Sequence, residues 1–286
     1  MKKILTLILI IMSASTSAQV NWQNNPVGAV FAREGGESPE GTFRLYSDGI
    51  EVFTLISSDK TEFYQPASLF YGENDADKAR VDALAPSGKV ASSMNCFLVN
   101  YNGRKILIDT GLPSSRGGKT IDRLLSLGIK TSDIDAIYIT HSHHDHIGGL
   151  LEEDTDATYP NASLYISSTE WDYLKGTSKE MADNIEKAYN GRIITFQAGE
   201  ILQGDILPVA APGHTPGHVV YNLGNLLFVG DILHGESVQL IYPDICANFD
   251  ADRKEAIISR EKILRYAVGR SLTVLGAHIP NNGVLF

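Results

Sequence analysis

Five histidines and two aspartates in this chain follow the order and spacing of a site for two metal ions. The densest stretch is Thr140-His141-Ser142-His143-His144-Asp145-His146, which fits the pattern HxHxDH, and His214, Asp231 and His278 follow further on. Neutral imidazole suits zinc and other borderline metals, and carboxylates add oxygen donors. The pattern therefore predicts a hydrolytic site with two divalent metal ions, and zinc is the expected metal.

The same spacing suggests how the ligands divide between the two ions. We expect the first ion to take three histidines, the second to take an aspartate and two histidines, and the remaining aspartate to bridge them. In that order, the groups are His141, His143 and His214; then Asp145, His146 and His278; then Asp231. A water between two such ions is acidified towards a pKa of about 7 and becomes the nucleophile. Scattered histidines are the alternative, but five of the eight histidines fit one template in order.

Each ligand group follows an apolar run that is typical of a buried strand. The runs are residues 134–140, 209–213, 226–230 and 273–277. Ligands at the carboxyl ends of strands are expected to meet at one edge of a sheet. The HxHxDH stretch itself must lie on a loop, because no regular strand or helix turns four near-consecutive side chains inward. Gly148 and Gly149 then permit close backbone approach.

These motifs, together with Asp109-Thr110-Gly111 and residues 212–218, resemble those of the metallo-β-lactamase superfamily in the same order. The resemblance covers residues 109–278 and implies an α/β fold, the αββα four-layer sandwich, with the metals at one edge. In that family, an aspartate at the position of Asp109 supports a metal-bound histidine. A carboxylate that holds the outer ring N–H fixes the tautomer of the ligand. A plain turn aspartate is the alternative.

His234 lies three residues after Asp231, where the lactone-hydrolysing branch often has a tyrosine that polarises the substrate carbonyl. A histidine here could donate a hydrogen bond to the developing oxyanion; a solvent-exposed histidine is the alternative. The run Asp231-Ile232-Leu233-His234 and the pair Phe249-Asp250 resemble methyl parathion hydrolase more closely. Lactam-hydrolysing members often have a cysteine where this chain has Asp231, which argues against β-lactam hydrolysis.

The favoured function is therefore an exported dinuclear metal-dependent hydrolase of esters, foremost a lactonase. It would open acyl-homoserine lactones by attack of a metal-bridging hydroxide, with Asp145 relaying the proton to the leaving alkoxide. A phosphotriesterase or arylesterase resembling methyl parathion hydrolase is the alternative. The non-enzyme alternative, a metal-binding protein with a degenerate site, is disfavoured because no ligand position is missing.

Residues 1–18 resemble a signal peptide, which predicts a periplasmic or secreted protein. Lys2 and Lys3 precede an apolar run, residues 4–12, that is too short to span a bilayer, and small and polar residues follow it up to Ala18. Residues 19–286 suit a single metallo-β-lactamase-like hydrolase domain. No other segment has the length of a membrane span.

The net charge and the two cysteines bear on the binding partners and on a possible disulfide. The net charge is −10, with 24 basic and 34 acidic residues and no cluster of Lys and Arg. Such a chain is a poor nucleic-acid binder. The expected partner, from the metal motifs, is a small-molecule ester or lactone. A homodimer remains an open alternative. Cys96 and Cys246 either form a disulfide or remain two separate buried thiols.

Further elements are predicted from turn and capping signals. Strands are expected in residues 44–56 around Ser47-Asp48-Gly49, and a hairpin in residues 94–108 around Asn102-Gly103. The predicted helices are residues 121–127, a helix opened by a capping box at Ser167 and Glu170, residues 179–189, and residues 253–268 capped by Asp250 and ended by Gly269. Residues 58–93 are predicted to be irregular. Their four aromatics between positions 63 and 71 favour an N-terminal arm that packs on the core or on a second subunit, rather than a substrate-binding wall.

Overall fold

The structure is a computed structural model that describes residues 38–59, 63–72, 75–152 and 155–285. The predicted signal peptide, residues 1–18, lies outside the described residues. Within the described part of the chain, no helix is both long and apolar enough to cross a membrane.

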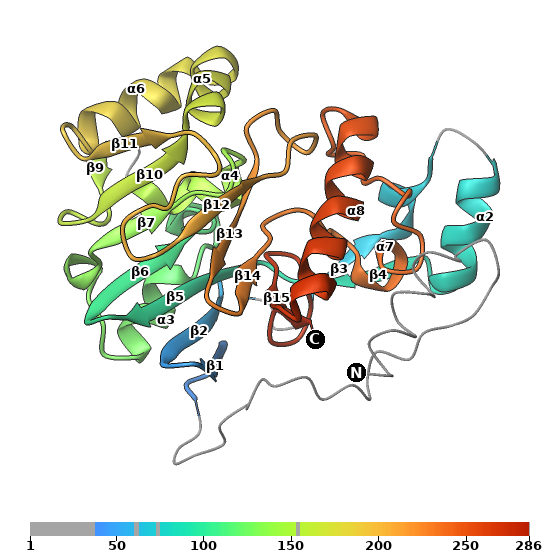
Figure 1. The fold of residues 1–286 in the computed structure, drawn as a ribbon, viewed down its shortest axis with the longest axis horizontal. Coiled ribbons are helices and arrows are strands. Elements are labelled where there is room, and N and C mark those ends of the chain that lie inside the picture. The colour runs from blue at the N-terminus through green and yellow to red at the C-terminus, as the bar shows by residue number, and fades with distance from the viewer. Residues whose placement is uncertain (1–37, 60–62, 73–74, 153–154, 286) are drawn as a thin grey trace.

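Two β-sheets pack face to face at the centre of the molecule (Figure 1). The larger has the order β1-β2-β5-β6-β7-β10-β11 and the smaller has the order β12-β13-β14-β15-β16. The larger sheet consists of β1 (Thr42–Ser47), β2 (Ile50–Ile56), β5 (Asn95–Tyr101), β6 (Arg104–Ile108), β7 (Ala136–Tyr138), β10 (Ser163–Ser167) and β11 (Ile193–Phe196). The smaller consists of β12 (Leu207–Ala210), β13 (Val219–Leu223), β14 (Leu226–Phe228), β15 (Thr273–Leu275) and β16 (Val284–Leu285). Two further two-stranded antiparallel sheets are β3 (Phe63–Pro66) with β4 (Lys89–Ser92), and β8 (Leu151–Glu152) with β9 (Asp156–Ala157).

Helices cover the outer faces of both sheets. The α-helices are α2 (Asp75–Leu84), α3 (Thr120–Ser126), α4 (His144–Ile147), α5 (Ser168–Thr177), α6 (Lys179–Ala188), α7 (Glu236–Gln239) and α8 (Arg253–Arg270). The 3-10 turns are η2 (Ala67–Phe70), η3 (Ser114–Arg116), η4 (Thr131–Asp133) and η5 (Gly148–Leu150). Buried residues of α3, α5 and α6 share a core with the larger sheet, and α8 packs on the smaller one. The predicted αββα four-layer sandwich is therefore confirmed.

The alternation of side chains along each strand builds these layers. On β6, Ile106 and Ile108 point into the core between the sheets, whereas Leu107 points into the core beneath the helices. On β5, Phe97 belongs to the inter-sheet core and Leu98 to the helical one. A strand covered on both faces reads as a continuous apolar run, which explains the unbroken hydrophobic stretches in the sequence.

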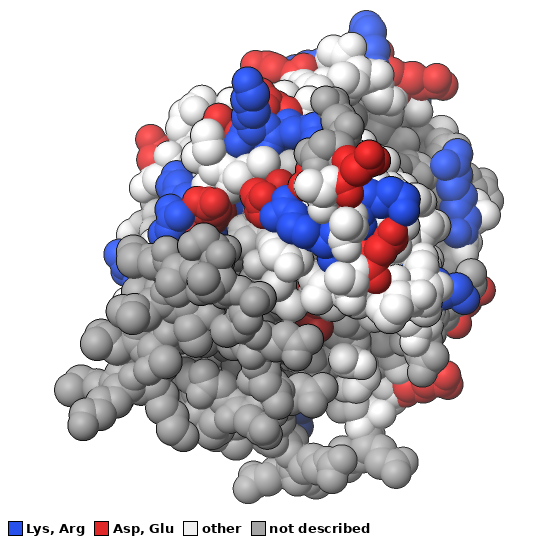
Figure 2. Space-filling view, turned by 90° about the vertical axis from the view of Figure 1, so that its right-hand side faces the viewer, with Lys and Arg blue, Asp and Glu red and all other residues white. Residues whose placement is uncertain are grey.

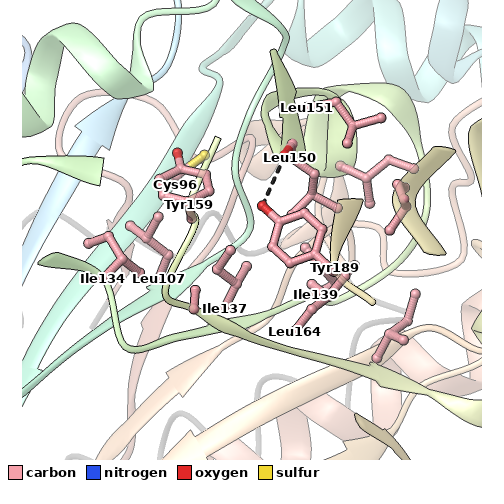
Figure 3. Packing of buried hydrophobic residues seen from close by; sticks show 14 of the residues in the cluster. Cys96, Leu107, Ile134, Ile137, Ile139, Leu150, Leu151, Tyr159, Leu164 and Tyr189 are labelled. Carbon is pink, nitrogen blue, oxygen red and sulfur yellow. Dashed lines mark hydrogen bonds between the residues drawn. The ribbon is translucent and has the colours of Figure 1, made fainter. Parts of the chain in front are cut away.

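The core beneath α5 and α6 also supports the backbone that follows α4. Figure 3 shows Tyr189, at the end of α6, pointing at Leu150, and its hydroxyl donates a hydrogen bond of 2.9 Å to the Leu150 carbonyl. Gly148 and Gly149 precede Leu150. A Cβ on Gly149 would clash with the Thr110 carbonyl and one on Gly148 would lie 2.5 Å from Pro113 Cδ. The predicted close approach at these glycines is confirmed.

Residues 58–93 are not irregular, and that prediction was wrong. They include η2, α2 and the antiparallel β3–β4 pair, which pack on residues 238–247 around a small separate core. Helix α2 was not predicted from the sequence because it buries a single residue, Val81, and therefore has no apolar stripe. Phe70 is buried in this core, which agrees with the packing arm, whereas Tyr64 is exposed.

Charged side chains of both signs mix on the face that carries α2 (Figure 2). Arg80 pairs with Asp77 and Asp244, and Lys78 pairs with Asp82. The absence of a nucleic-acid partner stays a prediction, but these basic residues are already paired with carboxylates.

Several smaller predictions were also tested. The hairpin at Asn102-Gly103 and the turn at Ser47-Asp48-Gly49 are present. Cys96 and Cys246 are both buried and free, so the thiol alternative holds. Helix α8 begins at Arg253, as predicted, but Asp252 rather than Asp250 caps it, and it runs past Gly269 to Arg270, where Ser271 with a φ of +54° ends it.

Candidate metal centre

Strand ends bring the predicted ligands together. Asp109 follows β6, and the HxHxDH stretch follows β7, which runs parallel to β6. Asp231 and His278 follow β14 and β15, which are parallel to each other. His214 follows β12. Carboxyl ends of parallel strands share an edge, so segments more than 130 residues apart in sequence meet at one site.

The first predicted group converges through its ring nitrogens. His214 Nε2 lies 3.1 Å from His141 Nε2 and 2.8 Å from His143 Nδ1, and the latter two atoms are 3.1 Å apart. Asp231 Oδ2 lies 3.3 Å from His214 Nε2. These four residues have the donors and the proximity needed to hold a metal ion.

The second predicted group lies on the other side of Asp231. His278 Nε2 is 3.4 Å from Asp145 Oδ2, and His146 Nε2 is 3.7 Å from the same oxygen. Asp231 Oδ1 lies 3.1 Å from His146 Nε2, and Asp231 Oδ2 lies 3.1 Å from His278 Nε2. Asp231 therefore sits between both groups, in the position expected of a bridging carboxylate.

In three of the histidines, Nδ1 points away from the centre and Nε2 points towards it, and the partner of Nδ1 shows whether Nε2 can bind a cation. His146 Nδ1 contacts Asp109 Oδ2 at 2.8 Å, His214 Nδ1 contacts Asp250 Oδ1 at 3.0 Å, and His278 Nδ1 contacts the Ser93 carbonyl at 2.8 Å. Each partner is an acceptor, so each Nδ1 carries a proton and each Nε2 faces the centre, where it can bind a cation once it carries no proton of its own.

Unpaired atoms at the centre point the same way. Among the described residues, the buried His146 Nε2 and Asp231 Oδ1 have no hydrogen-bond partner. Lone pairs that face one another at about 3 Å repel unless a proton or a metal ion lies between them. The donor set of five imidazoles and two carboxylates fits two borderline ions such as zinc.

Burial and charge shift the pKa values of the predicted ligands in opposite directions. Burial lowers the pKa of His143 to about 4, and the neighbouring His214 adds to the effect. Burial opposes the charge on His278 as well, but Asp231 and Asp145 outweigh it and raise its pKa to about 10. For Asp231, burial opposes ionisation, yet the surrounding histidines, His146 first, hold its pKa well below the usual range. The carboxylates therefore create a negative field that favours cations.

Asp109 is a structural support rather than a plain turn residue in this structure. Its Oδ1 accepts a hydrogen bond from Thr140 N and its Oδ2 one from Thr140 Oγ1, both at 2.8 Å, besides the contact with His146. Its backbone φ is +59°, a left-handed conformation that is uncommon outside glycine. With its proton given to Asp109, Thr140 Oγ1 can accept the Nδ1–H of His141 at 3.1 Å.

His218 is buried, and both of its ring nitrogens contact backbone atoms instead of facing the two ligand groups. Its Nδ1 lies 3.1 Å from the Ala211 carbonyl, and its Nε2 accepts a hydrogen bond of 3.2 Å from Asp231 N. Burial lowers its pKa to about 3, so the ring stays neutral and can act as this acceptor. Gly230 has φ of +52°, and a Cβ there would lie 2.7 Å from His218 Nε2, so a side chain would displace the ring.

His234 is not solvent-exposed, since only 1% of it is accessible. Its Nε2 lies 3.2 Å from Asp231 Oδ2, but neither ring nitrogen makes an aligned hydrogen bond to a described residue. The ring stacks on His278 and lies 5.6 Å, centroid to centroid, from the ring of Phe249, which is 47% exposed. Burial lowers the pKa of His234, and Asp231 offsets this only in part.

Two buried carboxylates of the site were missed by the sequence interpretation. Asp250 holds His214 instead of capping α8, and Glu170 contacts the ligand loops instead of closing a capping box. Both precede or begin a helix, so the sequence alone assigned them to helix capping and gave no reason to place them in the site. The pair Phe249-Asp250 was the one signal in the sequence, through its resemblance to a branch of the family.

Comparison with known proteins identifies the family. The sequence profile of the metallo-beta-lactamase superfamily matches residues 91–278, more than half of the chain. The chain belongs to this superfamily. It is 33% identical over 141 residues to BaeB of Bacillus velezensis, a probable polyketide biosynthesis zinc-dependent hydrolase, over 49% of this chain and 56% of that protein. The chain spans about half the length of the curated relatives it matches.

Two solved structures are similar in fold over more than four fifths of the chain. The hydrolase AbOPH superposes with a TM-score of 0.74 and 27% identity, covering 85% of this chain and 92% of that chain. AidC, described as a dizinc quorum-quenching lactonase, superposes with a TM-score of 0.74 and 24% identity, covering 87% and 94%. At that level of identity, AidC is similar in fold.

Proposed function

We propose that this chain is a hydrolase that uses two divalent metal ions, zinc first among them, to open lactones of the acyl-homoserine type. The observation that carries the proposal is the position of Asp231, with Oδ1 3.1 Å from His146 Nε2 and Oδ2 3.3 Å from His214 Nε2. Oδ1 thus faces the second ligand group, whereas Oδ2 lies between the two groups, because it is also 3.1 Å from His278 Nε2. When bound, such ions supply an acidified water and a Lewis acid for the substrate carbonyl.

Asp145 is the residue best placed to move the proton. Its side chain is 25% exposed, against 3% for Asp231, so it faces the accessible side of the centre. Burial disfavours its charge, but His146 and His278 lower its pKa overall, and it is ionised at neutral pH. Attack on the lactone carbonyl breaks the ring C–O bond. The ring oxygen leaves as an alkoxide, a far stronger base than a carboxylate, and takes from Asp145 the proton that the attacking water gave up.

His234 is proposed to donate a hydrogen bond to the oxygen of the attacked carbonyl. Its ring lies between the ligand His278 and the exposed Phe249, and both of its nitrogens lack an aligned partner among the described residues. A preorganised donor in a buried site costs no reorganisation when charge develops on the substrate. Phe249 would contact the apolar part of the substrate.

The choice of a lactone is supported by the similarity to AidC, whose structure holds the product N-hexnoyl-L-homoserine. The phosphotriesterase or arylesterase alternative would use the same residues and differ in the shape of the substrate. We propose in addition that the protein is exported, on the strength of residues 1–18. A small diffusible lactone outside the cell suits that location.

Removal and return of metal tests the proposal. Purified protein is stripped with a chelator, and hydrolysis of acyl-homoserine lactones is followed before and after zinc is restored. Activity should disappear with the metal and return with it. Unchanged hydrolysis in the stripped protein, or no hydrolysis of any ester in the zinc-loaded protein, would refute a metal-dependent hydrolase.

A further inference from the structure

Glu170 is a fully buried carboxylate, 0% exposed, in the first turn of α5. Its Oε1 accepts hydrogen bonds from Ser142 N at 2.8 Å and Ser142 Oγ at 2.5 Å. Its Oε2 accepts hydrogen bonds from Thr215 Oγ1 at 2.7 Å and Gly217 N at 3.0 Å. All four donors are neutral, and no ion pair to Glu170 is present in the described part of the chain.

Each oxygen of this carboxylate serves a different loop. Ser142 lies between His141 and His143, so Oε1 holds the loop after β7. Thr215 directly follows His214, so Oε2 holds the loop after β12. Because the two oxygens belong to one rigid group, Glu170 fixes the separation of the two loops whose ring nitrogens converge at 2.8–3.1 Å.

The start of α5 adds a second connection to the same loop. Ser167 caps the helix by accepting a hydrogen bond of 3.1 Å from Glu170 N, and its Oγ donates one of 2.7 Å to the Gly217 carbonyl. A Cβ on Gly217 would clash with the backbone of Glu170, so a glycine is needed for this approach. The positive end of the helix dipole also favours a carboxylate in its first turn.

The chemistry of the four donors calls for a carboxylate. An ionised carboxylate is an acceptor only, and it can take all four hydrogen bonds. A glutamine would turn an NH2 group towards two buried donors and leave them without an acceptor. A buried charge without a counter-ion is costly for the fold alone. A cation bound between the two loops would attract that charge and offset the cost.

We propose that Glu170 is the positioning residue that joins the two loops of the first ligand group and sets the affinity of that group for its ion. This rests on the proposed function only in that metal ions bind at the centre. Glu170 does not touch the ion or the substrate. It acts through Ser142 and Thr215, which neighbour the three histidines in sequence.

The test compares Glu170→Gln with Asp172→Asn, an exposed carboxylate-to-amide change on the same helix. Two zinc dissociation constants are measured for each protein by competition with a chromophoric chelator, and the visible spectrum is recorded after loading with Co²⁺. We expect Glu170→Gln to weaken one of the two ions about 10–100-fold and to alter its Co²⁺ spectrum. The other ion should change less than about threefold, and Asp172→Asn should match the wild type.

A purely structural role would give a different result. It would lower the melting temperature of the metal-free protein but leave both dissociation constants unchanged, and this would overturn the proposal. Equal weakening of both ions would overturn it too. If Glu170→Gln does not fold, Thr215→Val removes one donor from the same carboxylate and is judged by the same criteria. None of these measurements needs a substrate, so they stand even if the lactonase proposal fails.

Discussion

Asp250 Oδ1 lies 3.0 Å from His214 Nδ1, so an aspartate that the sequence predicts as a helix cap holds a predicted metal ligand instead. Its Oδ2 accepts a hydrogen bond of 3.3 Å from the buried Arg260, which also binds the Ile232 carbonyl at 2.8 Å. Burial opposes the charge on Asp250, but His214 and other neighbours lower its pKa to about 2. Helix α8 is thereby connected to the first ligand group and to the segment after Asp231.

Asp250→Asn should weaken zinc binding by about 10–100-fold, since the amide has one acceptor oxygen for two partners and no charge to hold the His214 N–H. Competition with a chelator measures the loss. Asp252→Ala is the matched control, because Asp252 accepts hydrogen bonds from Lys254 N and Glu255 N as the true cap of α8. The control should cost about 1 kcal/mol of stability and leave zinc affinity unchanged. The same affinity in both variants and the wild type would deny Asp250 its role.

The contrast between these aspartates shows that local capping rules cannot predict which residue makes a tertiary contact. Asp250 and Asp252 both precede a helical stripe, and either can cap a helix; tertiary contact with His214 decides between them. Glu170 presents the same problem, because a glutamate three residues after a serine already fits a capping box. The ligands, by contrast, were predictable because their types, order and positions after apolar runs reflect the sheet edge itself. Helix α2 was missed because it buries little more than Val81.

Asp231 should control both ions, since it lies between the two ligand groups. Elemental analysis of zinc-loaded wild-type protein should approach two equivalents per chain. Asp231→Ala should reduce the occupancy of both ions together with activity, because each group loses a donor. Saturation of the wild type at one equivalent would contradict the assignment of seven ligands to two ions.

His234 can be separated from the ligands by its effect on turnover alone. His234→Phe keeps the ring that packs between His278 and Phe249 but removes both nitrogens. If His234 donates to the oxyanion, kcat for a lactone should fall by about 10²–10³-fold while bound zinc remains at the wild-type level. Loss of zinc in this variant would instead make His234 a ligand or a support of Asp231, and an unchanged kcat would leave it a packing residue.

The two cysteines should be unreactive in the folded protein. Burial raises the pKa of Cys96 to about 12 and also raises the pKa of Cys246, so both are protonated thiols across the neutral range, and the thiolate is the reactive form. A thiol-specific reagent at pH 8 should find almost no reactive group in the native state and two after unfolding in denaturant. Fewer than two in unfolded, non-reduced protein would indicate the disulfide instead.

The expected substrate preference follows from the different geometries of lactones and phosphotriesters at this site. A lactone presents a trigonal carbon, and its ring oxygen must reach Asp145 to receive a proton. A phosphotriester presents a tetrahedral phosphorus, and its aryl leaving group needs an aromatic pocket. At the centre, the ring of Phe249 lies 5.6 Å from that of His234 and is 47% exposed; it can cover an acyl chain but cannot by itself enclose an aryl group.

We therefore expect kcat/KM for acyl-homoserine lactones to exceed that for paraoxon-like triesters by at least about tenfold, which corresponds to a transition-state difference of about 1.4 kcal/mol. Initial rates on both classes, with one zinc-loaded preparation, give the ratio. Phe249→Ala should lower kcat/KM for long-chain lactones more than for short-chain ones, because the exposed ring contributes apolar area only where the chain reaches it. Comparable rates on the two classes would leave a generic ester hydrolase. A reversed order would favour the phosphotriesterase, whose leaving group would then have to find its pocket beyond Phe249.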